Sequence, residues 1–275
     1  MNGLISMRVY VGNEVDGLTL RYQEYGNKDA SLIVFLHGGG VSSWMWDKQV
    51  QYLTDYHCVT LDLPEQGLNV DKGKFSIKYS ACKIIELIEE IGQGKRVTVI
   101  GFSLGAQVLV QMLSFRQDLI DYAIINSALV KPNRFGEKLI SPLIRLTFPL
   151  IKNRAFSRLQ AKTLFIGDEY FERYYNESCQ MERNTLVRIL KENMSFEIPA
   201  EFSEAKGEIL VTVGEKEKAV MKSSAIDIVN CNKNCTGIII SGIGHGVPLA
   251  KPDFFNQTIE KWINDGKIPK ECTKI

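Results

Sequence analysis

The sequence has little of several features that would narrow its function at once. No apolar run among its 275 residues reaches the 18 or so residues that a membrane-spanning helix needs. Neither sign of charge is in excess, because 33 Lys and Arg against 32 Asp and Glu leave a net charge of +1. This balance argues against a protein that holds nucleic acid through a broad basic field. We therefore expect neither stable membrane insertion nor a nucleic-acid partner.

The amino-terminal residues and the cysteines favour a cytoplasmic location. Residues 1–8 lack a basic segment followed by a long apolar stretch, so we expect no secretory signal peptide. The six cysteines are scattered, and only Cys231 and Cys235 form a close pair. A zinc site would need two further ligands, and the chain has three histidines in all. We expect free thiols, no metal and no cofactor.

Short β-type runs alternate with amphipathic segments in the first half of the chain. The run 32–36 is continuously apolar, which is typical of a strand buried on both faces. A helix is predicted over residues 76–92, where five isoleucines and Ala81 recur at steps of three and four. Further strands are expected at 18–25, 58–61, 97–100 and 122–126, and a further helix at 104–115. This alternation predicts an α/β fold with a mostly parallel sheet flanked by helices.

The alternation stops after residue 129 and resumes at residue 207. In residues 130–206 no β-type run of comparable quality occurs, and helices are predicted near 139–151, 157–166 and 182–193. Strands return at 209–213 and 237–240, with helices at 219–229 and 254–263. We expect a core domain of residues 1–129 and 207–275, interrupted by a helical cap of residues 130–206. Because ligands bind at the carboxyl ends of parallel strands, such an insertion should cover the site.

Residues 139–151 leave two interpretations open. The segment is rich in Leu, Ile, Phe and Pro, with Lys138 and Arg145 at its margins. A lid helix that packs over an apolar pocket is the favoured interpretation. An amphipathic helix that lies on a membrane surface is the alternative. On the favoured interpretation the ligand is a partly apolar small molecule.

The strongest chemical signal is Gly101-Phe102-Ser103-Leu104-Gly105, between a predicted strand and a predicted helix. In that context G-x-S-x-G is typical of a nucleophile elbow. Side chains two positions from the serine would clash with the neighbouring strand and helix, so glycine is needed on both sides. The strained turn should lift the Ser103 hydroxyl above the sheet. The helix N-terminus beneath it offers N–H donors to a developing anion.

A second signal is His37-Gly38-Gly39-Gly40, directly after a buried apolar run. Glycines let backbone N–H groups face a ligand, and an oxyanion hole needs two such donors. We predict the N–H groups of Gly39 and Leu104 as the pair, with Gly40 as the alternative to Gly39. The side chain of His37 is expected to hydrogen-bond within its loop rather than act as a base.

A serine nucleophile needs a base to take its proton, and the histidines offer few choices. His57 precedes a strand and should lie at the far end of the sheet. That leaves His245, flanked by glycines after the last predicted strand. An acid that orients the imidazole should follow the strand 209–213, where Glu215 and Glu217 are both candidates.

Taken together, these stretches resemble the α/β-hydrolase superfamily over nearly the whole chain outside the helical insertion. The resemblance rests on Leu36-His37-Gly38, Trp44-Met45-Trp46-Asp47, Val59-Thr60-Leu61-Asp62-Leu63-Pro64, the elbow at Ser103, Gly242-Ile243-Gly244-His245-Gly246 and Lys251-Pro252. The family usually has G-x-x-D where this chain reads Gly214-Glu215-Lys216-Glu217, so the resemblance ranks Glu217 over Glu215 as the acid. A second departure is Pro64-Glu65-Gln66-Gly67 in place of P-G-H-G, which should reshape a loop without removing catalysis.

The resemblance implies a carboxylesterase-like serine hydrolase that acts on a small, partly apolar ester or related acyl substrate. The helical insertion is similar to the caps of esterases and of C–C bond hydrolases. A C–C bond hydrolase of the same fold is therefore an alternative, as is a ligand-binding or sensing member with little turnover. The resemblance implies no cofactor, and the oligomeric state is not predicted.

Overall fold

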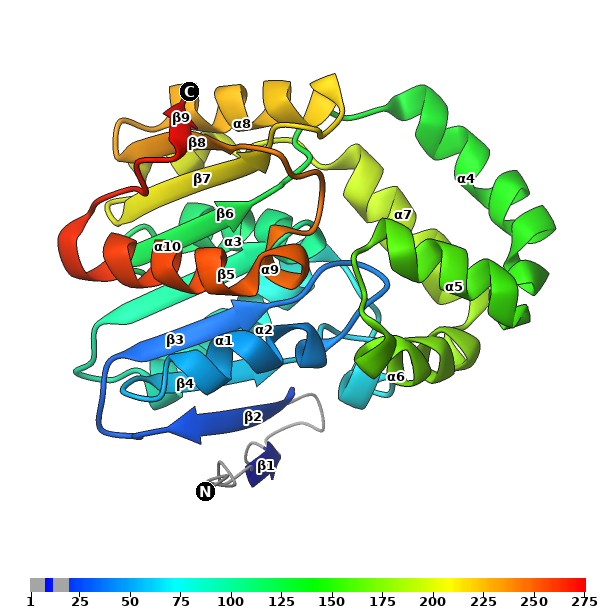
Figure 1. The fold of residues 1–275 in the computed structure, drawn as a ribbon, viewed down its shortest axis with the longest axis horizontal. Coiled ribbons are helices and arrows are strands. Elements are labelled where there is room, and N and C mark those ends of the chain that lie inside the picture. The colour runs from blue at the N-terminus through cyan, green and yellow to red at the C-terminus, as the bar shows by residue number, and fades with distance from the viewer. Residues whose placement is uncertain (1–7, 12–19) are drawn as a thin grey trace.

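The computed structural model describes residues 8–11 and 20–275 (Figure 1). A single sheet contains nine strands in the order β1-β2-β4-β3-β5-β6-β7-β8-β9. The strands are β1 Arg8–Val11, β2 Arg21–Gly26, β3 Leu32–Leu36, β4 His57–Leu61, β5 Val97–Phe102, β6 Tyr122–Asn126, β7 Glu208–Gly214, β8 Cys235–Ile240 and β9 Cys272–Lys274. The six strands from β4 to β8 in this order are parallel, and β1, β2 and β9 pair antiparallel at the edges. The predicted mostly parallel sheet is confirmed.

Two sequence-based expectations lie partly or wholly outside the described residues. The expectation of no signal peptide rests on residues 1–8, of which Arg8 alone is described, and the predicted strand 18–25 begins with two residues that are not described. The described part of that strand is β2.

Helices cover both faces of the sheet, and the continuous apolar run of β3 is the reason. All five residues of β3 are buried, and they alternate between two hydrophobic clusters. Leu32, Val34 and Leu36 face α2 (Ile77–Ile91), α3 (Leu104–Phe115) and α8 (Ala219–Cys231). Ile33 and Phe35 face α1 (Asp47–Tyr52), the short α9 (Val247–Ala250) and α10 (Pro252–Asp265). The sheet is therefore the middle layer of three (Figure 1).

Four helices connect β6 to β7 and lie beyond the carboxyl ends of the parallel strands (Figure 1). They are α4 (Arg134–Thr147), α5 (Arg154–Thr163), α6 (Asp168–Gln180) and α7 (Arg183–Ser195), with 3-10 turns η3 (Phe148–Lys152) and η4 (Ala200–Glu204). The chain enters and leaves these helices at one place, because the N–H of Asn133 donates to the carbonyl of Met194 at 2.8 Å. In the described part of the chain, no helix has the length and apolar character needed to cross a bilayer.

Side chains of α6 and α7 fasten this helical segment to the core. The Glu177 carboxylate on α6 accepts hydrogen bonds from Ser42 Oγ at 3.0 Å and Trp44 Nε1 at 2.9 Å. On α7, Glu192 accepts the N–H of Ile77 at 2.8 Å, which satisfies the first turn of α2. The predicted helices 139–151, 157–166 and 182–193 correspond to α4 with η3, to α5 and to α7. Helix α6 was not predicted from the sequence.

Candidate active site

Ser103 lies in the single-residue turn between β5 and α3. Its backbone has φ 53° and ψ −109°, a conformation that a residue with a side chain adopts at a cost. The turn is held by the Ser103 N–H, which donates to Asn126 O at 2.8 Å. The serine is therefore displayed at the carboxyl end of a central strand, in front of the N-terminus of α3.

The two glycines of the motif allow the close packing that this turn requires. A Cβ added at Gly101 would lie 2.5 Å from the carbonyl oxygen of Gly105. A Cβ added at Gly105 would lie 2.4 Å from the carbonyl oxygen of Leu36. Both distances are shorter than a carbon and an oxygen can approach without displacing backbone. The expectation that each flank of Ser103 needs glycine agrees with these contacts.

The glycine loop after β3 lies against the start of α3. A Cβ at Gly39 would be 3.6 Å from Leu104 Cδ2 and 3.9 Å from Leu104 Cβ, so the two residues are neighbours. The first N–H groups of a helix have no partner within the helix, and Leu104 is the first residue of α3. Gly40 has φ 81°, and a Cβ there would meet nothing within 4 Å. The structure thus brings the predicted donors Gly39 and Leu104 to one place beside Ser103.

His245 reaches this place from the loop after β8. Its ring centroid lies 4.9 Å from that of Phe102, the residue before Ser103. Its Nδ1 lies 2.8 Å from Glu217 Oε2, and its side chain is about one-third exposed, at 33%. The imidazole therefore has one nitrogen engaged by a carboxylate, while part of the ring is open to solvent.

Glu217 is the buried partner of His245. Its side chain is 1% exposed and also accepts Ser127 Oγ at 2.6 Å and the N–H of Gly214 at 3.0 Å. Burial acts to raise its pKa, but the hydrogen bond and charge of His245, with the bonds from Ser127 and Gly214, outweigh it and hold the pKa below its usual value. The group is thus an ionised carboxylate with satisfied acceptors. Glu215 instead accepts the N–H of Gly242 at 2.7 Å through Oε2.

The other two histidines are used elsewhere. His37 is fully buried, with Nδ1 bonded to Gly38 O at 2.7 Å and Nε2 accepting the N–H of Leu63 at 2.9 Å. Burial lowers its pKa, so it is neutral and structural within the loop. His57 begins β4, at the amino end of the parallel strands, with Nδ1 3.1 Å from Lys95 Nζ. Burial and then Lys95 lower its pKa as well.

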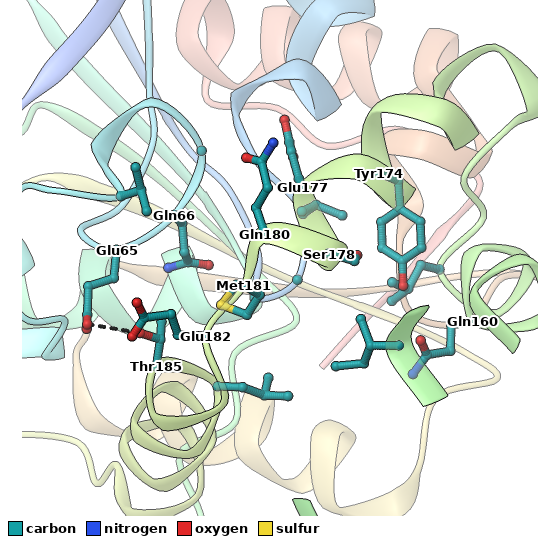
Figure 2. Close-up of a pocket in the computed structure, with 18 of the residues that line it drawn as sticks. Glu65, Gln66, Gln160, Tyr174, Glu177, Ser178, Gln180, Met181, Glu182 and Thr185 are labelled. Carbon is teal, nitrogen blue, oxygen red and sulfur yellow. Dashed lines mark hydrogen bonds between the residues drawn. The ribbon is translucent and has the colours of Figure 1, made fainter. Parts of the chain in front are cut away.

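A cavity of about 450 Å³ opens between the glycine loop and the helical segment. Gly39 and Gly40 line it from the core, and residues of α5, α6 and α7 line it from the other side (Figure 2). Ser103 and His245 are not among the lining residues, so the cavity adjoins the elbow on the side of the glycine loop. Of residues 139–151, Ile151 alone lines the cavity. The expectation that this whole segment packs over a pocket is therefore wrong for α4.

Glu65 ties the core to α7 at the edge of this cavity. Its carboxylate accepts Arg188 Nε at 2.8 Å and Nη2 at 2.6 Å, Thr185 Oγ1 at 3.0 Å and the N–H of Phe75 at 2.7 Å. Burial raises its pKa, but these four bonds, above all those from Arg188, outweigh burial and lower it. The residue has φ 63°, which a glycine would adopt more readily.

Sequence reasoning identified the stretch around Glu65 as unusual but missed its bond to α7. It also missed Glu177, because α6 was not predicted. The spacing of Phe171, Tyr174 and Tyr175 at i, i+3 and i+4 was the available signal for that helix.

Comparisons with known proteins agree with this architecture. Residues 33–258 match the profile described as the alpha/beta hydrolase family. The chain is 27% identical over 114 residues to an uncharacterized hydrolase of Bacillus subtilis, a match that covers 40% of this chain and 41% of that protein. It is 27% identical over 93 residues to an esterase of Mycobacterium tuberculosis, covering 33% of this chain and 30% of that protein. The matched stretches thus span less than half the length of these curated relatives.

Among solved structures, an esterase from Exiguobacterium antarcticum superposes with a TM-score of 0.77. The superposition covers 91% of this chain and 97% of that chain at 17% identity. At this identity the likeness concerns the fold.

Proposed function

The chain belongs to the alpha/beta hydrolase family, and from that premise we propose that it is a serine hydrolase with Ser103 as nucleophile, His245 as base and Glu217 as the acid. The observation that carries the proposal is the 2.8 Å contact between His245 Nδ1 and Glu217 Oε2 beside the Ser103 elbow. An ionised carboxylate at Nδ1 keeps a proton there and leaves Nε2 free to accept one. Glu215 has no part in this chemistry.

The reaction proceeds through an acyl-enzyme. His245 Nε2 takes the Ser103 hydroxyl proton as Oγ forms a bond to the carbonyl carbon of an ester. The tetrahedral oxyanion accepts hydrogen bonds from the N–H groups of Gly39 and Leu104. The leaving alcohol departs with the proton from His245. Water then adds to the acyl carbon and gives one proton to His245. The Ser103 Oγ–carbon bond breaks, His245 returns that proton to Oγ, and the acid is released with the Ser103 hydroxyl restored.

Gly40 is the alternative to Gly39 as the first oxyanion donor. The proximity of Gly39 to Leu104 favours Gly39, because two donors must converge on one oxygen atom. The positive φ of Gly40 gives its N–H an orientation that few other residues supply, so substitution there is expected to disturb the loop in either case.

The helical segment, residues 130–206, acts as a cap over the acyl site. A cavity of about 450 Å³ is large enough for a small molecule, and it adjoins the proposed oxyanion donors. Apolar Val41, Ile151 and Leu164 line it together with the polar side chains labelled in Figure 2. This lining supports a small ester or related acyl substrate that is partly apolar and carries a hydrogen-bonding group.

A fluorophosphonate probe tests the proposal directly. We expect the full chain to be labelled at Ser103, and the label to be lost in Ser103→Ala and strongly reduced in His245→Ala. A panel of p-nitrophenyl esters of increasing acyl length then defines the substrate. No labelling of the folded protein would refute the serine hydrolase and leave a ligand-binding member. Labelling of Ser103 with every ester inert would refute the ester substrate and leave the serine-hydrolase mechanism standing.

A further inference from the structure

Positive charge is concentrated in one stretch of this nearly neutral chain. Residues 131–162 hold eight Lys or Arg against the single acid Glu137, a net charge of +7 in a chain whose total is +1. Three of the eight are paired, as Lys131 with Asp227, Arg154 with Glu172 and Arg158 with Asp168. Within residues 8–11 and 20–275, the other five form no ion pair: Arg134, Lys138, Arg145, Lys152 and Lys162.

The same stretch displays large apolar side chains to solvent. Phe135 is 76% exposed and Leu146 is 78% exposed, and Leu139, Leu143 and Leu150 are each more than 40% exposed. Their spacing of four, four, three and four residues places them on one face of α4 and its continuation η3. Ile140, about 100° round the helix from the middle of this face, is buried where α4 packs on α7. We call the five exposed side chains the apolar row.

The apolar row has no role in the cavity or in the core. Helix α4 lies at the outer edge of the molecule, with α7 between it and the sheet (Figure 1). None of its residues lines the cavity. A row of this size on the surface of a protein marks an interaction site.

Basic side chains accompany the row on its exposed side. At 100° per residue, Arg134, Lys138 and Arg145 fall on one flank of the row, and all three are exposed. Their long aliphatic stems can lie along apolar surface while their charges reach a polar layer. An exposed apolar face bordered by Lys and Arg is the pattern of a helix that lies in the plane of a lipid interface.

We propose that α4 and η3 dock on an anionic lipid bilayer, with the apolar row in the headgroup and acyl boundary and the flanking basic residues on lipid phosphates and carboxylates. Charge favours an anionic bilayer over a second copy of the chain as the partner of this surface. A two-fold contact between copies would bring Arg134, Lys138 and Arg145 of both copies to one interface with no acid to balance them but Glu137. An anionic leaflet supplies the opposite charge over its whole area.

Docking in this way would orient the cavity with respect to the lipid. Leu150 ends the apolar row, and the next residue, Ile151, lines the cavity wall. The cavity wall therefore follows the lipid-contacting row by one residue in the sequence. The docking proposal stands without the serine hydrolase, since none of its residues lies at the elbow.

Flotation of the full chain with lipid vesicles tests the proposal. We expect binding to phosphatidylcholine vesicles that contain about a third phosphatidylserine, weaker binding to phosphatidylcholine alone, and release by salt. The triple variant Arg134→Gln/Lys138→Gln/Arg145→Gln should lower partition into anionic vesicles by about a hundredfold, since each charge is worth about a factor of five. Phe135→Ser/Leu146→Ser should lower partition to a similar extent, roughly a hundredfold, by removing buried apolar area.

Matched variants elsewhere on the surface control for composition. Ile226→Ser removes an apolar side chain of α8 that is 45% exposed, and Lys206→Gln/Lys233→Gln/Lys261→Gln removes three exposed charges. Both should bind as the wild type does. Circular dichroism verifies that each variant is folded. We expect all of them to fold, because every substituted side chain is exposed.

Three outcomes would overturn the proposal. The first is failure of the wild type to prefer anionic vesicles, and the second is equal binding by the Phe135→Ser/Leu146→Ser variant. The third is a concentration-dependent dimer in sedimentation velocity that this variant abolishes and that vesicles do not disrupt, which would assign the row to a second copy. Fluorophosphonate labelling of Ser103 is measured on the same samples, so failure of docking and failure of the serine hydrolase are separated.

Discussion

Replacing Glu217 by Gln isolates the charge that holds His245. The amide has the size of the carboxylate, and its oxygen can go on accepting from Ser127 Oγ and the Gly214 N–H. Its NH₂ group then faces His245 Nδ1, where a carboxylate oxygen stood at 2.8 Å. A donor at Nδ1 selects the imidazole tautomer whose proton is on Nε2. That tautomer cannot take the proton of Ser103.

The size of the effect follows from this inverted tautomer. In a serine protease the corresponding Asp-to-Asn change lowers kcat by about 10⁴ and leaves the geometry intact. We expect Glu217→Gln to lower kcat by about 10³ to 10⁴, or roughly 4 to 5.5 kcal/mol of transition-state stabilisation. KM should change little, because Glu217 is buried behind His245 and does not line the cavity. The assay is steady-state hydrolysis of a p-nitrophenyl ester that the wild type accepts.

Glu215→Gln is the matched control. Glu215 is two residues away, but its carboxylate accepts the Gly242 N–H, and an amide oxygen can do the same. We expect kcat within about threefold of the wild type, less than 1 kcal/mol. Equal and small losses in the two variants would refute the assignment of Glu217. Thermal melts of both variants show whether any loss arises from unfolding instead.

Three further predictions concern the elements that support the site. Glu65→Gln should lower the free energy of unfolding by about 2 kcal/mol at pH 7 through its bonds with Arg188. Because the folded pKa of Glu65 is depressed, its stabilisation is present above the unfolded pKa and lost as pH falls through the folded pKa. In urea titrations, the difference in the free energy of unfolding between the wild type and Glu65→Gln should therefore be smaller at pH 3 than at pH 7. A difference that does not change with pH would contradict the ionic bond. Gly105→Ala should destabilise by about 3 kcal/mol or more in thermal melts, since its Cβ would lie 2.4 Å from Leu36 O, and a melt like the wild type's would argue against this packing. Ser127→Ala should reduce kcat about tenfold by removing one hydrogen bond to the Glu217 carboxylate, and full activity would mean that this bond does not help hold Glu217.

The core of the fold could be predicted because its signals are local. Three signals each specify a structure within a few residues: the buried run 32–36, the isoleucine periodicity of 76–92 and the two glycines around Ser103. Helix α6 and strand β9 were missed for the opposite reason. The α6 sequence is polar and aromatic, and its helix is held by distant partners, such as Trp44 stacked on Tyr170 with ring centroids 5.2 Å apart. Strand β9 is three residues long and exists by pairing with β8.

The candidate site could be predicted in part for similar reasons. Three histidines and one G-x-S-x-G motif left few choices for Ser103 and His245, and the structure places His245 on Glu217. Sequence periodicity identifies an amphipathic helix, but it does not show what its apolar face contacts. The apolar residues of α4 were therefore predicted to line a pocket, whereas in the structure they face solvent. Glu65 could not be connected with Arg188, because the two are 123 residues apart in the sequence.

The hydrogen bond between Asn133 and Met194 has a topological consequence. Parallel strands need a crossover, and the chain must return from the carboxyl end of β6 to the amino end of β7, roughly 17 Å for five residues. Residues 195–207 can span that distance alone, because Asn133 and Met194, which flank most of the helical segment, are hydrogen-bonded to each other. The four helices are thus an insertion whose two ends meet at Asn133 and Met194, and the crossover from β6 to β7 does not depend on them. A chain without residues 134–193 would need only a tight turn, at little cost in loop entropy, to keep every strand in register.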